Sequence, residues 1–299
     1  MRRSLLVMGT VMFLAVAAAF SNPRALLTDS EIQQDERSPQ SAAPLNNDAS
    51  TFQFAIVSGR TGGHRARVFS QAVEQLNLLQ PEFVVSVGDL IEGYSEDAPR
   101  LVGEWREFQT YAHQLKMPFF YLPGNHDVAN DFQDKLWKEK FGRRYYHFVY
   151  KNVLFLMLNS EDPGGKKAPG KFSAEQIAYF KNVLAENKDV RWTLMYLHRP
   201  IWNNKNVEKT GWPAIEQALQ GRRFTVFCGH EHIYAREIRG SSKFYTFATT
   251  GGSSKLRGTP FGEFDHIVWV TMKADGPILA NLMQEGIFPE DVTVAAPGR

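Results

Sequence analysis

The 299-residue chain carries 34 basic and 32 acidic residues, and 43% of its residues are hydrophobic. Such a composition supports a large core and excludes a chain that is disordered over most of its length. The near-neutral charge, without a dense basic patch, argues against a nucleic-acid-binding surface, and the single cysteine, Cys228, excludes an internal disulfide.

The chain begins with Met1-Arg2-Arg3 and an apolar run over 5–20, which small residues close just before Asn22-Pro23. This is the layout of a secretory signal peptide with a cleavage site near residue 21. An uncleaved anchor helix is the alternative, but the run is slightly short for a full membrane span. We therefore expect residues 1–21 to be a signal peptide. The mature protein would be exported to the periplasm or the extracellular space, without a stable membrane anchor.

Residues 22–50 are rich in Asp, Ser, Gln, Asn and Pro and show no sustained hydrophobic period. This composition predicts a disordered linker. Apolar patterning starts at Phe52, so one globular domain is expected over 51–289. Residues 290–299 are predicted to form a flexible tail.

Within the domain, apolar runs alternate with amphipathic stretches. The runs 54–57, 83–87 and 119–122 predict strands, separated by a helix over 69–79 and a second helix that carries Trp105 to Leu115. Later segments predict a hairpin that turns at Lys151-Asn152, a helix capped by Ser173 and Gln176, and a short helix over 213–219. Further strands are expected at 192–197, 225–228, 244–249 and 267–272. This order indicates an α/β fold in which a largely parallel sheet packs against a second, mixed sheet with helices outside.

Side chains of metal-binding types follow four of these strands. In chain order they are Asp89, Asn125 with His126, His198, and His230 with His232. Each has an ordinary alternative taken alone, as a turn residue, a helix cap or a strand-end histidine. Because ligand sites collect beyond the carboxyl ends of strands, their joint occurrence predicts a transition-metal site.

The motifs Gly88-Asp89, Gly124-Asn125-His126-Asp127, His198 and Gly229-His230-Glu231-His232 resemble those of the calcineurin-like metallophosphoesterases. The resemblance covers roughly residues 52–272. It implies a four-layer α/β/β/α sandwich of two mixed sheets flanked by helices, the metallo-dependent phosphatase-like fold, with 51–289 as the phosphoesterase domain. It also implies an enzyme that hydrolyses a small phosphate mono- or diester by metal-activated water.

The resemblance implies a role for each matching residue. Asp89 would bridge two metals, and His126 would donate a proton or stabilise the transition state, oriented by Asp127. The second metal would also be held by Asn125, His198 and His230, and the first by His232. Glu92 stands where purple acid phosphatases carry an iron-binding tyrosine, so Mn, Fe, Zn or Ni without a tyrosinate ligand is expected.

The first motif of the family, Ser-Asp-x-His-Gly, is degenerate here. Gly59 occupies its Asp position and Thr61 its His position, so the first metal site loses two ligands. Thr61 could offer at most a weak neutral oxygen, and His64 lies close enough in sequence to be a substitute. Arg60 could clamp a phosphate oxygen or face solvent, and both interpretations stay open.

The sequence thus predicts a hydrolase of reduced activity with one firm metal site and one doubtful site. A catalytically inert phospho-ligand-binding protein that retains one metal is the main alternative. A structural surface protein with a vestigial site is a third. The substrate, the choice between monoester and diester, and the oligomeric state are not fixed by the sequence.

Overall fold

The computed structural model describes residues 48–162, 170–283 and 286–289. The chain divides into two units, Met1–Asp48 and Ala49–Arg299, and every element named below belongs to the second. The predicted signal peptide, most of the predicted linker and the tail 290–299 lie outside the described residues. In the described part of the chain, no helix is long and apolar enough to span a membrane.

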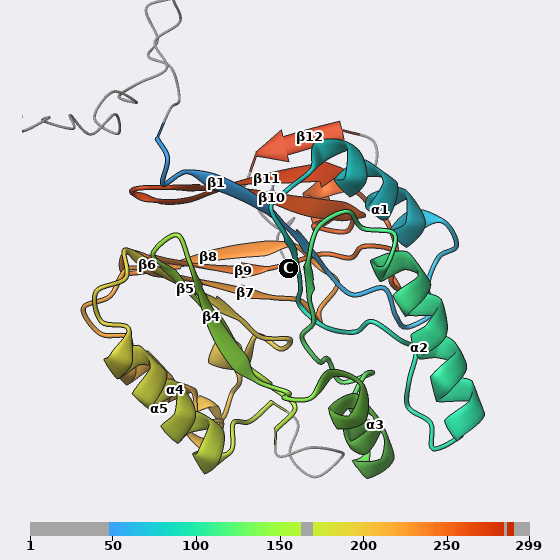
Figure 1. Cartoon of the computed structure of the whole chain (residues 1–299), viewed down its shortest axis with the longest axis horizontal. Helices are drawn as coiled ribbons and strands as arrows, with labels where there is room; N and C mark the ends of the chain where they lie inside the picture. Colours follow the sequence, from blue (N-terminus) through green and yellow to red (C-terminus); the bar gives the residue numbers. More distant parts are fainter. Residues whose placement is uncertain (1–47, 163–169, 284–285, 290–299) are drawn as a thin grey trace, which may run out of the picture. The chain divides into compact units, whose positions relative to one another are not determined.

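Two six-stranded sheets form the centre of this unit (Figure 1). The first has the order β12 (Gly286–Pro289), β11 (Gly276–Met283), β10 (His266–Lys273), β1 (Phe52–Val57), β2 (Val84–Ser86) and β3 (Phe119–Phe120). The second has the order β4 (Tyr146–Tyr150), β5 (Val153–Met157), β6 (Trp192–Tyr196), β7 (Phe224–Cys228), β9 (Ser242–Thr246) and β8 (Ala235–Arg239). Strands β1, β2 and β3 are parallel, as are β5, β6, β7 and β9, while all the other pairings in the two sheets are antiparallel. Both sheets are therefore mixed, and the second is largely parallel, with three parallel pairings among its five.

Helices cover the outer face of each sheet, as Figure 1 shows. The helices α1 (Val68–Leu79), α2 (Ala98–Ala112) and α3 (Asp131–Phe141) pack on the first sheet, and α4 (Ala174–Glu186) and α5 (Trp212–Ala218) pack on the second. A third apolar cluster fills the space between the sheets. The four-layer α/β/β/α sandwich is confirmed.

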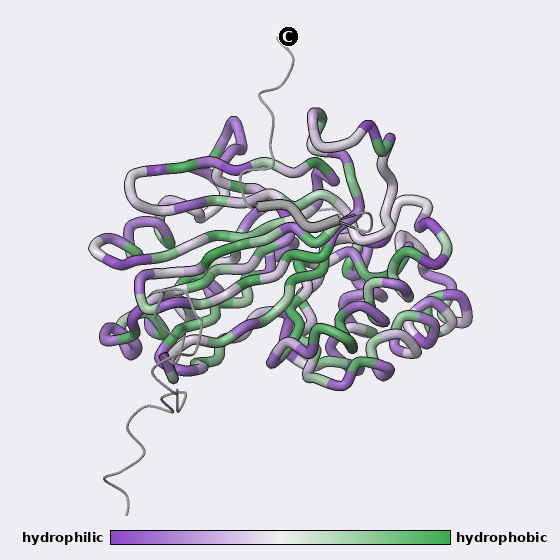
Figure 2. The backbone as a smooth tube through the Cα atoms, turned by 90° about the horizontal axis from the view of Figure 1, so that it is seen from above, coloured by the Kyte–Doolittle hydropathy of each residue, from purple (hydrophilic) through white to green (hydrophobic). Residues whose placement is uncertain are grey.

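Strand β1 shows how the sequence produces these layers. Phe54 and Ile56 point between the sheets, whereas Ala55 and Val57 point toward α1 and α2. Because both faces of the strand are covered, it needs a continuous apolar run rather than an alternating one. In Figure 2 the hydrophobic colour accordingly follows the strands through the interior.

Several local predictions are confirmed and others need correction. Lys151 and Asn152 turn the β4–β5 hairpin with φ of 43° and 58°, as a two-residue turn requires. Ser173 caps α4, but the Gln176 side chain bonds the backbone of Asn159 instead of closing a capping box. Helix α2 ends at Ala112 rather than reaching residue 115, and the third strand is only two residues long.

A buried histidine makes the stability of this fold depend on pH. His266 lies among the rings of Tyr234, Phe247 and Phe264, and its Nδ1 is 2.8 Å from Oδ1 of Asn281. Burial lowers the pKa of His266 to about 4, from the 6.5 of an unfolded chain. Between these values the unfolded chain binds more protons than the folded one, so folded stability falls as the pH falls.

We expect His266 alone to lower the free energy of unfolding by about 2 kcal/mol between pH 7.5 and pH 5. Urea unfolding of metal-free wild type and His266→Phe at both pH values checks this. The variant should lose that part of the pH dependence, whatever its stability at pH 7.5. Equal pH dependence in the two proteins would contradict the prediction.

Candidate metal centre

Four loops meet where the strands β2, β3, β6 and β7 end, and they carry Asp89, Asn125, His198 and His230. The approach of the first two loops depends on Gly124. A Cβ atom on this residue would lie 2.2 Å from Oδ1 of Asp89. The turns that carry Asp89 and His230 also adopt a left-handed backbone conformation, with φ of 61° at Asp89 and 71° at His230. Such strained positions are typical of functional sites.

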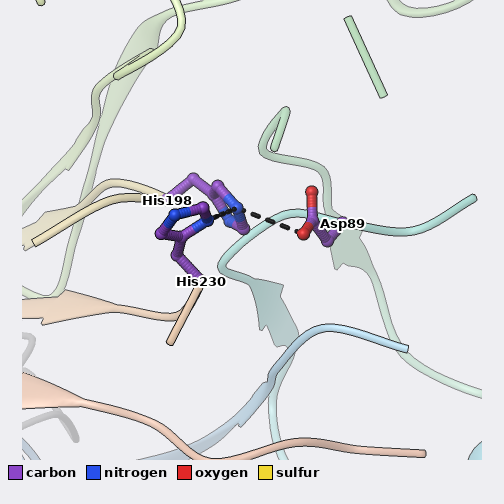
Figure 3. A group of neighbouring side chains, drawn as sticks. All are labelled: Asp89, His198 and His230. Carbon is purple, nitrogen blue, oxygen red and sulfur yellow. Dashed lines mark hydrogen bonds and ion pairs between the residues drawn. The ribbon is translucent and has the colours of Figure 1, made fainter. Parts of the chain in front are cut away.

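The ligand atoms of Asp89, His198 and His230 lie close together (Figure 3), and the Asn125 amide joins them. The Nε2 atom of His198 lies 3.2 Å from Oδ2 of Asp89, 2.9 Å from Oδ1 of Asn125 and 3.2 Å from Nδ1 of His230. Potential ligand atoms of Asp89, His198 and His230 all lie within 4.8 Å of one another. The structure thus brings together all four residues that the family resemblance assigns to the second metal.

The hydrogen bonds around His198 test whether this donor set fits a metal. Its Nδ1 is 2.8 Å from the carbonyl oxygen of Val87, so Nδ1 carries the proton and Nε2 of the neutral ring presents a lone pair. That lone pair faces the Asp89 carboxylate and the Asn125 amide oxygen, which are also acceptors. Acceptors at such distances need a proton or a cation between them. A mixed set of oxygen and nitrogen ligands fits a divalent transition metal.

The electrostatics of Asp89 and His230 agree with this fit, whereas the raised pKa of His198 means that a metal would have to displace a proton from its ring. Burial would raise the pKa of Asp89, but His198 and His126 outweigh it and hold the pKa well below its usual range. Burial would lower the pKa of His198, yet the Asp89 carboxylate raises it on balance. For His230, burial and then the neighbouring His198 and Arg199 lower the pKa to about 3. The carboxylate is therefore charged and His230 neutral, as metal ligation requires.

The first metal position, on the other side of Asp89, has fewer candidate ligands than the second. The Nδ1 atom of His232 is 2.7 Å from the carbonyl oxygen of Ser253, which leaves a buried Nε2 lone pair with no hydrogen-bond partner among the described residues. A Cβ atom on Gly59 would lie 2.9 Å from this Nε2 and 3.4 Å from Cβ of Asp89. An aspartate at position 59 would thus point at His232 and Asp89. Thr61 is buried nearby in sequence, and its hydroxyl oxygen has no partner in the described part of the chain.

The structure corrects both interpretations of Arg60, because the side chain neither reaches the metal ligands nor faces solvent. It is only 5% exposed, and its Nη2 donates to Oε1 of Glu107 at 2.6 Å. The guanidinium lies over the rings of Phe69, Phe108 and Tyr111. Successive residues of an extended chain point to opposite sides, so Gly59 faces the site and Arg60 faces the helices. A phosphate clamp by Arg60 is excluded in this arrangement.

His64 does not replace the missing first-metal ligands either. Its Nδ1 lies 3.0 Å from Oε1 of Glu92, and its Nε2 lies 3.8 Å from Oε1 of Glu107. The imidazole is thus engaged by two surface carboxylates. In the structure, only Asp89 and His232 of the four family ligands remain at the first metal position.

Asp127 has a different role from the one predicted. Its buried carboxylate accepts hydrogen bonds from the backbone N–H groups of Asp89, Leu90, Ile91 and Gly124, and it does so at 2.8–3.1 Å. Asp127 therefore fastens the two ligand-bearing loops together. Sequence proximity to His126 suggested an orienting role that the carboxylate does not perform.

His126 is oriented by backbone instead. Its Nδ1 lies 2.6 Å from the carbonyl oxygen of Glu92, and its backbone N–H donates to Oδ1 of Asp89 at 3.0 Å. With Nδ1 donating to a carbonyl, Nε2 is left to exchange a proton with a bound molecule. The structure thus places His126 directly beside the ligand cluster, with one ring nitrogen fixed.

Two more residues touch the cluster. Nη1 of Arg199 lies 2.7 Å from Nε2 of His230, while its Nε donates to Oε1 of Glu161 at 2.7 Å. The hydroxyl oxygen of Tyr94 accepts a hydrogen bond of 2.8 Å from Nδ2 of Asn125. The position of Arg199 beside His198 was a usable sequence signal, whereas nothing in the sequence marks Tyr94.

Comparison with known proteins gives consistent results. A family model described as calcineurin-like phosphoesterase matches residues 62–234, while a search of curated proteins finds no match. A dimetal phosphatase from Danio rerio is 13% identical with a TM-score of 0.61, over 82% of this chain and 99% of that chain. GAP50, the anchor in the inner membrane complex of Plasmodium, is 13% identical with a TM-score of 0.59, over 79% and 86%. PhoD is 11% identical with a TM-score of 0.56, over 83% and 73%.

At these identities the solved structures show only that the fold is shared, so the chemistry has to be argued from the residues of this chain. The family model, by contrast, covers more than half of the chain and includes the loops that carry Asp89, Asn125, His198 and His230. The protein therefore belongs to the calcineurin-like phosphoesterase family.

Proposed function

We propose that this protein is an exported phosphoesterase that hydrolyses a small phosphate mono- or diester with one firmly held divalent cation. The observation that carries the proposal is the set of facing acceptors on Asp89, Asn125 and His198, joined by His230. Mn, Fe, Zn or Ni suits this mixture of imidazole and oxygen ligands. The family supports hydrolysis of phosphoester bonds.

The chemistry divides between the cation and the side chains around it. A cation held there would polarise a phosphoryl oxygen and acidify a water molecule. Asn125 would present Oδ1 to the cation, because its Nδ2 donates to the hydroxyl oxygen of Tyr94. His126, fixed through Nδ1 by the Glu92 carbonyl, would hold at Nε2 the proton that the leaving alkoxide needs.

The degenerate first motif supports the proposal of a single firm ion. A second ion would be held only by Asp89, which is shared, by His232 and by at most the neutral hydroxyl of Thr61. Two-metal phosphoesterases stabilise the attacking and leaving oxygens with separate ions. We infer a slower reaction than that of a family member with a complete first motif.

Export is proposed on the composition of the amino-terminal residues. Arg2 and Arg3 precede the apolar run 5–20, and small residues follow it before Pro23. This order is typical of a cleaved signal peptide. The proposal places the enzyme outside the cytoplasm, where its substrate would be an extracytoplasmic phosphoester.

Substitution of His126 by alanine tests the catalytic part of the proposal. We expect turnover of bis- and mono-nitrophenyl phosphate in the presence of Mn²⁺ to fall by about 10²–10⁴-fold, because the proton source for the leaving group is lost. Metal content per chain should stay at the wild-type value, since the side chain is not a proposed ligand.

His113→Ala is the matched control, because His113 is an exposed residue at the end of α2. This variant should keep wild-type turnover. If wild type and His126→Ala are equally inactive but still bind Mn²⁺ and inorganic phosphate, the protein is an inert phospho-ligand-binding protein instead. The absence of bound metal in wild type would favour a vestigial site.

A further inference from the structure

The segment Glu92–Tyr94 lies against both Asn125 and His126. We propose that Tyr94 is a positioning residue that fixes this pair, through its hydroxyl group for Asn125 and through its ring for His126. The inference rests on the proposed function for its effect on turnover, but its effect on metal binding does not depend on turnover.

The hydroxyl group acts on the metal ligand. The Nδ2 atom of Asn125 donates to the hydroxyl oxygen of Tyr94 at 2.8 Å, while Oδ1 lies 2.9 Å from Nε2 of His198. An amide can present either its oxygen or its nitrogen to a metal, and only the oxygen binds one. The Tyr94 hydroxyl oxygen accepts from Nδ2 and so holds the amide in the orientation in which Oδ1 faces the ligand cluster. Partners of this kind commonly change metal affinity by about 10–100-fold.

The ring acts on the proton donor. It meets the imidazole of His126 edge to face, with the centroids 4.7 Å apart and the planes at 83°. The Glu92 carbonyl holds Nδ1 of the same imidazole at 2.6 Å. A hydrogen bond at one nitrogen leaves the ring free to swing about that contact, and an aromatic ring against its face restricts this motion.

The segment itself is held in place at several points. The Glu92 carboxylate accepts hydrogen bonds from the backbone N–H groups of Gly62, Gly63 and His64 at 2.9–3.2 Å. The backbone N–H of Gly93 donates to Oε2 of Glu104 at 2.8 Å. Gly62 is the last residue of the degenerate first motif, and Gly63 and His64 directly follow it. The loop that lost metal ligands thus anchors the segment that orients the remaining site.

The conformation of Tyr94 is costly and is not explained by burial. Its φ is +49°, a left-handed value that bulky residues rarely adopt, and the residue is 54% exposed. Gly93 before it has no room for a side chain, since a Cβ atom would lie 1.7 Å from the carbonyl oxygen of His126. Strain of this kind persists where the surrounding contacts fix it, and here those contacts are Asn125 and His126.

Two substitutions separate the two contacts. Tyr94→Phe removes the hydroxyl group and keeps the ring, so the Kd for Zn²⁺ in calorimetric titration should rise about tenfold. At saturating metal its kcat should stay within about threefold of wild type, because the His126 contact remains. Tyr94→Leu should show the same loss of Zn²⁺ affinity and a further fall in kcat of about tenfold at saturating metal.

Tyr179→Phe is the control, since the Tyr179 hydroxyl group contacts His147 rather than a residue of the cluster. Its Zn²⁺ affinity and kcat should match those of wild type, and thermal melts confirm that all variants fold. Unchanged Zn²⁺ affinity in Tyr94→Phe, or full kcat in Tyr94→Leu, would overturn the proposal. A wild-type protein that binds Zn²⁺ without turnover would overturn the proposed function, while the Tyr94→Phe titration would still decide the contact with Asn125.

Discussion

Replacement of Asp89 by asparagine is expected to remove bound metal from the protein and to reduce turnover by at least about a thousandfold. Asp89 supplies the only negative charge among the four ligands, and its Oδ2 lies 3.2 Å from Nε2 of His198. The substitution keeps the shape of the side chain but removes the charge that attracts a dication. If the new asparagine bound the cation through its amide oxygen, its NH₂ group would also face other ligand atoms.

Metal analysis after gel filtration, together with a nitrophenyl phosphate assay, checks this result. Asp97→Asn provides a matched control, because Asp97 caps α2 by accepting a hydrogen bond from the Arg100 backbone, which asparagine also does well. The control should retain metal and activity. An Asp89→Asn protein that still holds one ion per chain would mean that the cation lies elsewhere.

Restoration of the first motif by the double substitution Gly59→Asp and Thr61→His is expected to raise the metal content from one ion per chain to two. Turnover should rise by about a hundredfold, because a second ion would share the charge on the phosphoryl oxygens. The backbone at Gly59 lies outside the left-handed region, so an aspartate can occupy it. Its Cβ atom would meet Nε2 of His232 at 2.9 Å, and this ring has to shift slightly.

The variant Gly59→Ala separates the effect of the added metal ligands from the steric effect of a Cβ atom at position 59. It brings the same Cβ atom against His232 without a carboxylate, so it should bind one ion at most and gain no activity. Inductively coupled plasma mass spectrometry of protein purified without chelator gives the metal count. Two tightly held ions in the wild-type protein would contradict the proposal of a weakened first site.

That the candidate ligands come together could be predicted from the sequence, because the signals are local. Asp89, Asn125, His198 and His230 each follow an apolar run that forms a strand, and parallel strands bring their carboxyl ends to one rim. The strands themselves are recognisable because burial on both faces demands continuous apolar runs. The hairpin at residues 151–152 was equally local, since its turn needs only two residues with positive φ.

The errors concern side-chain directions and weak patterns. Arg60 lies next to the site in sequence but points into the helical layer, and Asp127 binds backbone rather than His126. Helix α3 was missed because its sequence buries only Gln133 and Trp137, too few residues to show a helical period. Tyr94 reaches Asn125 through a left-handed turn, which no residue pattern foretells.

The origin of the four ligands has a consequence for the strength of the fold. Asp89 and Asn125 follow strands of the first sheet, whereas His198 and His230 follow strands of the second. An ion shared by all four would act as a cross-link between the two halves of the sandwich, in a chain whose lone cysteine forms no disulfide. Binding free energy of this kind adds directly to stability. A protein with modest turnover would therefore still gain from keeping these four residues, since the ion that they hold would fasten its halves together.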